Sequence, residues 1–84
     1  MTKEEINIVC DLYDKKAEIM KYMYTAESLL EIYKHDNDNE AAKYQCGKKY
    51  AYMDAMTIIS EVINKIKNGG YNGTTDEKTK NSPM

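Results

Sequence analysis

The densest group of side chains that could bind a metal or move a proton lies near the middle of the chain. Asp36, Asp38 and Glu40 alternate with other residues, as the acidic residues do at the start of an EF-hand calcium loop. The match then ends, because Ala41 stands where that loop needs glycine and Gly47 stands where it needs glutamate. The segment therefore predicts a turn with capping carboxylates, and at most a weak, adventitious cation site.

The sequence contains no other motif typical of a catalytic or metal site. His35 is the only histidine, and it follows Glu31 by four residues, whereas the di-iron helical bundles use a spacing of three. Asp11 and Asp14 form a carboxylate pair, but they fall on the solvated face of a predicted helix, where no pocket would shift a pKa. The sequence also has no glycine-rich phosphate loop. We therefore expect no enzymatic activity, no cofactor, no metal site and no small-molecule substrate.

Composition limits the classes of protein to which the chain can belong. Its 84 residues suffice for one domain at most. It has 12 basic residues, all lysine, against 14 acidic residues, and this balance argues against a dedicated polyanion binder. No segment approaches the roughly 20 apolar residues of a membrane span, and no secretory signal is evident. We therefore expect no membrane association, a cytoplasmic location and free thiols on both cysteines.

Helix signals divide residues 1–70 into two long helices. Thr2 and Glu5 have the form of a capping box, which predicts a first helix over about 3–35. Residues 36–38 are poor helix formers and predict a turn, with Asn37 and Glu40 as a second capping-box-like pair. The second helix should run over about 39–68 and stop at the glycines that follow. A connection this short makes the two helices antiparallel neighbours.

Apolar residues recur on both helices with the alternating three- and four-residue spacing of a coiled coil. The expected core seam consists of ten residues: Val9, Leu12, Ile19, Met23, Leu30, Ala55, Ile59, Val62, Ile63 and Ile66. Folding the chain about its turn brings Leu12 near Val62, and Glu27 near Lys48. Tyr44 and Tyr52 are expected to point to the seam. The sequence thus predicts an all-α fold, an antiparallel two-helix hairpin resembling a coiled coil.

The apolar side of the first helix is wider than a two-helix seam requires. The residues that widen it are Ile6, Cys10, Tyr13, Ala17, Met20 and Tyr24. An isolated hairpin would leave many of them in water, whereas two hairpins packed as a four-helix bundle would cover them. We therefore expect a homodimer, with a hairpin completed by a different protein as the alternative. Residues 71–84 have almost no apolar content and are expected to be a disordered tail.

Tyrosine is the remaining compositional signal, with eight tyrosines and no phenylalanine or tryptophan. Most of them lie in the half of the hairpin nearest the turn. Tyrosine is enriched at protein interfaces, although it also suits the flanks of an ordinary seam. The candidate partner-binding residues are Tyr22, Tyr24, Tyr44, Lys48, Lys49, Tyr50 and Tyr52.

These features favour a non-enzymatic protein-interaction module. Its size and its lysine- and asparagine-rich composition are typical of phage and mobile-element accessory proteins that bind and inhibit or regulate a host protein, including anti-defence inhibitors. The alternative is a four-helix-bundle dimer that binds RNA or DNA through Lys43, Lys48 and Lys49, with neighbouring tyrosines stacking on unpaired bases. A third possibility is a plain structural oligomer. A protein partner is favoured over nucleic acid because the net charge is -2.

Overall fold

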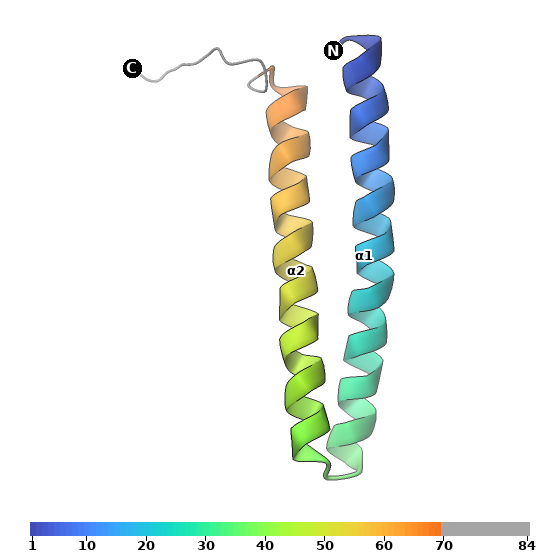
Figure 1. The fold of residues 1–84 in the computed structure, drawn as a ribbon, viewed down its shortest axis with the longest axis vertical. Coiled ribbons are helices and arrows are strands. Elements are labelled where there is room, and N and C mark those ends of the chain that lie inside the picture. The colour runs from blue at the N-terminus through green and yellow to red at the C-terminus, as the bar shows by residue number, and fades with distance from the viewer. Residues whose placement is uncertain (70–84) are drawn as a thin grey trace, which may run out of the picture.

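The structure, a computed structural model, describes residues 1–69 and consists of two long helices packed side by side (Figure 1). Helix α1 spans Lys3–His35 and helix α2 spans Asn39–Lys67. The helices run in opposite directions, so that the N-terminus lies beside the end of α2, and the connection lies at the far end of the pair. The predicted antiparallel hairpin is confirmed. The expected tail, 71–84, lies outside the described residues.

Helix α1 begins at the predicted capping box. The backbone N–H of Glu5 donates to the hydroxyl of Thr2 over 3.1 Å, and the N–H of Thr2 donates to the Glu5 carboxylate over 2.8 Å. These bonds satisfy two backbone donors that the first helical turn would otherwise leave unpaired. Glu4 and Glu5 also place negative charge at the positive end of the helix dipole.

The connection between the helices is a Schellman turn followed directly by a cap. The N–H of Asp38 donates to the carbonyl of Tyr33 over 2.9 Å, and that of Asn37 donates to Lys34 over 3.1 Å. Asn37 adopts a left-handed conformation with φ 61°, which asparagine tolerates better than most residues. Asp38 then caps α2 by accepting from the N–H of Ala41. The predicted capping by Asn37 and Glu40 is therefore wrong, because Asn37 ends the first helix instead.

The largest apolar cluster lies at the end of the hairpin farthest from the turn. Val9, Ile63 and Ile66 are buried there, and Leu12, Ile59 and Val62 pack against them. Leu12 and Val62 thus pack against the same cluster, as the predicted register requires. The other four residues of the expected seam, Ile19, Met23, Leu30 and Ala55, are also buried or half-buried.

The half of the hairpin near the turn is packed with smaller side chains. Ala26, Leu30, Ala42 and Gln45 are its buried residues. Tyr44 is 65% exposed, so the expectation that it points to the seam is wrong. The helical phase places Ala42 and Gln45, three residues apart, against α1, and Tyr44 therefore projects to the side.

Contacts in the middle of the hairpin fix its alignment. Glu27 forms an ion pair with Lys49, with Nζ and Oε2 3.1 Å apart, so the expected pairing with Lys48 is wrong by one residue. Lys49 lies four residues after Gln45 and shares its side of α2, whereas Lys48 is rotated by about 100°. The Tyr22 and Tyr52 rings pack 5.9 Å apart between centroids.

Candidate interaction surfaces

The candidate tyrosines do not form one patch. Tyr22, Tyr24, Tyr44 and Tyr50 are exposed, and Tyr52 is half-buried. On α1, Tyr22 and Tyr24 are separated by about 160° around the helix axis. On α2, the angle between Tyr50 and Tyr52 is about 160° as well. The Tyr22–Tyr52 contact therefore lies on one face of the hairpin, and Tyr24 and Tyr50 belong to the opposite face.

The candidate lysines likewise fail to form one basic surface. Glu27 accepts a hydrogen bond from the Lys49 ammonium, and this bond, together with the carboxylate charge, raises the pKa of Lys49 above its ordinary value of 10.5. The Lys48 ammonium lies over the Tyr44 ring, 5.5 Å from its centroid, as in a cation–π contact. Lys43 is exposed and is rotated by about 140° from Lys48. The three charges thus point in different directions.

A groove lined by methionines runs along one face between the helices. Met20 and Met23 from α1 meet Met53 and Met56 from α2 in a hollow of about 420 Å³. Methionine is flexible and polarisable, and it adapts to the shape of a partner. A second hollow, lined by Tyr13 and Ile63, extends this groove toward the open end of the hairpin and shares Lys16, Ser60 and Asn64 with the first. We call the combined feature the methionine groove.

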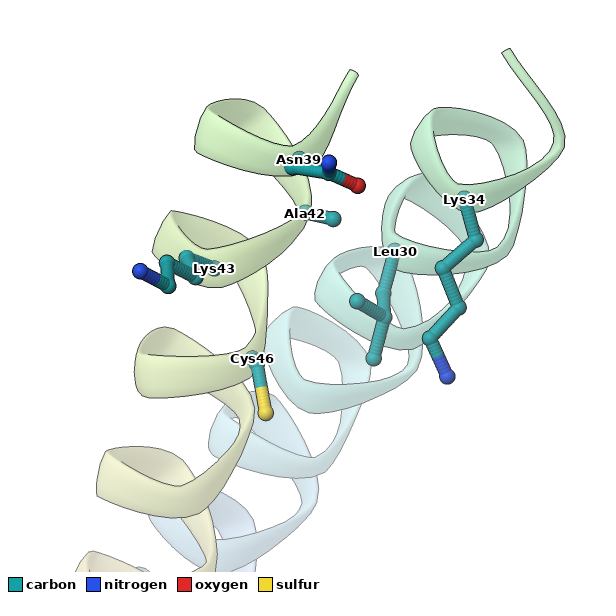
Figure 2. A pocket seen from close by; sticks show the side chains of 6 residues that line it. All are labelled: Leu30, Lys34, Asn39, Ala42, Lys43 and Cys46. Atoms are coloured by element: carbon teal, nitrogen blue, oxygen red, sulfur yellow. The ribbon is translucent and has the colours of Figure 1, made fainter. Parts of the chain in front are cut away.

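A further hollow, the turn hollow, lies near the connection and is shown in Figure 2. Leu30 and Cys46 point from the two helices into the space between them, and Ala42 lies beside them. Lys34 lines the rim on α1, whereas the Lys43 ammonium points away from α1. A whole number of heptads separates Lys34 from Met20, so this hollow opens on the same face as the methionine groove.

Two uncharged stripes border this face, one on each helix. The α1 stripe consists of Ile6, Cys10, Tyr13, Ala17, Met20 and Tyr24, and the α2 stripe consists of Cys46, Tyr50, Met53, Thr57, Ser60 and Asn64. Tyr13 and Met20 line the groove from α1, and Met53 and Ser60 line it from α2. Neither stripe contains a charged residue, although 31% of the chain is charged. The two borders of the methionine groove are therefore uncharged, and the charged residues Lys16 and Glu61 line the hollow between them.

The sequence-based predictions do not include two features of the hairpin, the methionine groove and the burial of Gln45. Met20 with Met23 and Met53 with Met56 have helical spacing, and this spacing is the sequence signal for the groove. Gln45 is only 7% exposed, and its side-chain oxygen has no hydrogen-bond partner. A buried, unpaired amide oxygen is unfavourable by about 1–3 kcal/mol. No sequence signal distinguishes this glutamine from an exposed one.

In residues 1–69, the acidic residues of the turn serve as helix caps and short-range contacts, and the two cysteines form no disulfide. Asp38 caps α2, and the Asp36 carboxylate lies 3.4 Å from Nδ1 of His35. Within residues 1–69, no three side chains of histidine, cysteine, aspartate or glutamate come together in a group able to hold a metal ion. Cys10 and Cys46 are both free, Cys10 exposed and Cys46 half-buried, so the prediction of two unlinked thiols is confirmed.

Comparison with known proteins assigns no relative to this hairpin. No protein-family model, no curated protein and no solved structure matches the chain. Neither of the two described helices is long and apolar enough to cross a membrane. Function therefore has to be inferred from the surfaces of the hairpin itself.

Proposed function

We propose that this chain is a non-enzymatic protein-interaction module whose hairpin pairs with a second copy to form a four-helix bundle. One observation carries the proposal: within residues 1–69, large apolar side chains are more often exposed than buried. Six apolar residues are buried, and two of these are alanines, whereas eleven large ones are exposed. Five of the eleven, Ile6, Tyr13, Tyr24, Tyr50 and Met53, lie along the two stripes beside the methionine groove, and soluble monomers rarely leave a contiguous apolar surface uncovered.

The arrangement of the helices supports the same proposal. Each helix buries only a narrow stripe against the other, and a two-helix layer has two open faces. A second hairpin that packs face to face with the first gives each helix a second neighbour. Closed two-fold symmetry is the commonest way for identical chains to satisfy such surfaces. The role is then to bind protein, first a second copy and then a regulated target.

Nucleic-acid binding receives less support from the same residues. Polyanion binding depends on several lysines that neutralise phosphates together. Here Lys49 is neutralised by Glu27, and Lys43 and Lys48 face different directions. The tyrosines that could stack on bases are divided between two faces. A protein that binds protein is therefore the better match to this surface.

The proposal is tested by the mass of the full-length chain in solution. Light scattering after gel filtration, over a hundredfold concentration range, should give twice the chain mass of 9.7 kDa at the upper concentrations. Apolar association also predicts that the mass changes little with added salt, because salt screens only charge. A folded monomer at every concentration would refute the dimer. Binding of single-stranded RNA with a steep salt dependence would favour the nucleic-acid alternative.

A further inference from the structure

We infer that the second copy docks on the methionine face with α1 antiparallel to α1 of the partner, and that the two α1 stripes form the centre of the interface. This inference rests on the proposed dimer and specifies its geometry. The partner is a second copy of this chain, and the docking surface consists of the α1 stripe, the α2 stripe and the methionine groove between them.

The α1 stripe has the form of a seam of its own. Its six residues repeat with spacings of four and three, as the core seam does, but they lie beside that seam, rotated by about 100° around α1. All of them except Met20 are exposed in the single hairpin. The repeat matches the left-handed packing of one helix against another. It therefore predicts a second helix along α1, in addition to α2.

Side-chain sizes along this stripe favour an antiparallel partner. If the two-fold axis of the dimer passes level with Lys15, the two α1 helices run antiparallel. Ala17 then faces Tyr13 of the partner subunit, and Cys10 faces Met20 of the partner subunit. Each small residue then meets a large one, which is how facing helices interdigitate. A parallel pair would instead place Tyr13 against its own copy and leave a gap at Ala17.

The charged residues at the two ends of the α1 stripe, Lys3 and Glu27, determine how the two α1 helices align along their length. A shift of one heptad in one direction would place Cys10 opposite Glu27, and a shift in the other direction would place Met20 opposite Lys3. The shift toward Lys3 buries an ammonium group against an apolar residue, which is unfavourable unless the charge is paired. The shift toward Glu27 covers the Glu27–Lys49 ion pair, and taking both ions out of water is also unfavourable. Only the alignment centred near Lys15 covers all six stripe residues with one another.

The exposed area on this face is large enough for a specific interface. Tyr13, Tyr24 and Tyr50 are 46%, 55% and 56% exposed, and at about 200 Å² for each aromatic side chain they offer roughly 300 Å². Ile6 and Met53 are 45% and 40% exposed. With them and the smaller stripe residues, two protomers would bury roughly 1,000 Å², the size at which specific interfaces begin.

The α2 stripe completes the interface with neutral groups. In the antiparallel arrangement α2 lies against α2 of the partner. The Tyr22–Tyr52 contact places residue 59 level with Lys15, so that Thr57 faces Ser60 of the partner subunit. Lys16 and Glu61 both line the methionine groove. A carboxylate of opposite charge is therefore available within the hollow when the groove is covered.

Disulfide trapping tests this geometry in the full-length chain. Cys46→Ser leaves Cys10 as the only thiol, and two Cys10 residues in the antiparallel dimer are displaced along the axis by about 15 Å, too far to bond. Adding Met20→Cys places a thiol opposite Cys10 of the partner subunit. Mild oxidation should convert most of the Cys46→Ser/Met20→Cys protein into a covalent dimer and leave Cys46→Ser monomeric on a denaturing gel.

Two other patterns of trapping would overturn the inference. Dimer formation by Cys46→Ser alone would indicate a parallel α1 pair, since Cys10 would face its own copy. Cys46→Ser/Asn64→Cys is the matched variant for a bundle in which α1 lies on α2 of the partner, because Asn64 lies level with Cys10 across the hairpin. Efficient trapping of that variant, with none at position 20, would refute the α1 pairing.

A substitution that adds a charge gives an independent readout. Ala17→Glu places a carboxylate at the centre of the α1 stripe and should reduce the mass in light scattering to that of one chain. Ala51→Glu is the control, since Ala51 is also an exposed helical alanine but lies outside both stripes, and it should leave the dimer intact. A dimeric Ala17→Glu protein would contradict the assigned face. A monomeric wild-type chain would instead contradict the proposed function itself.

Discussion

The cluster at the open end of the hairpin should dominate its stability, and Ile63→Ala tests this. Ile63 is only 2% exposed and packs with Val9 and Ile66. Truncating a buried isoleucine to alanine removes its transfer free energy and leaves a cavity, at a cost of 2–5 kcal/mol in most proteins. We expect about 3 kcal/mol here, because a two-helix layer can close part of the space.

The matched control is Ile58→Ala, five residues earlier on the same helix. Ile58 is 60% exposed, and it lies outside the surface assigned to the dimer. Both substitutions change helix propensity equally, so that their difference reports burial. Ile58→Ala should change the free energy of unfolding by no more than about 0.5 kcal/mol.

Urea unfolding followed by circular dichroism measures both effects. With an m-value near 1 kcal/mol/M, Ile63→Ala should lower the urea midpoint by roughly 3 M. All variants must be compared at one protein concentration, because the stability of a dimer depends on it. Equal losses for Ile58→Ala and Ile63→Ala would refute the assignment of the core to the Ile63 side of α2.

Three further predictions concern polar residues. Asn37→Ala should destabilise the hairpin by about 1 kcal/mol, because a left-handed conformation strains alanine, whereas Asn37→Gly should stay within about 0.5 kcal/mol of wild type; urea midpoints distinguish them. Gln45→Met should stabilise by about 1 kcal/mol by removing an unpaired buried oxygen, and a loss would mean that this oxygen is bonded in solution. The pKa of Lys49 is raised above 10.5. At pH values below 10.5, Glu27→Gln should therefore lower the melting temperature by a few degrees. This difference should shrink as the pH rises further, and a constant difference up to pH 12 would contradict the ion pair.

The sequence predicts the hairpin well because its signals are local. Thr2 with Glu5, the residues of the turn and Gly69 each determine a helix end within a few positions. The repeat of apolar residues then determines which side of each helix is buried. For these features, no knowledge of the distant chain is needed.

The sequence does not predict correctly which face a side chain lies on where adjacent residues of α2 compete for the same position. The sequence predicts that Tyr44 faces the seam and gives no such signal for Gln45, because aromatic character is a stronger apolar signal than a glutamine side chain. The predicted partner of Glu27 is Lys48 and the observed one is Lys49, two adjacent residues that differ by about 100° in direction. Such choices depend on the phase of α2 against α1, which only three-dimensional packing sets. The same helical phase divides the candidate tyrosines between the two faces of the hairpin.

The position of the apolar cluster also has a kinetic consequence. Val9 and Ile63 lie at the end of the hairpin opposite the connection, and a long segment of chain separates them. Bringing them together first would cost about 2 kcal/mol more loop-closure entropy than starting at the turn, at about 0.6 kcal/mol for each doubling of loop length. Folding should therefore start at the Asn37 turn and proceed toward the termini. The residues that start the hairpin are then different from those that prevent it from opening.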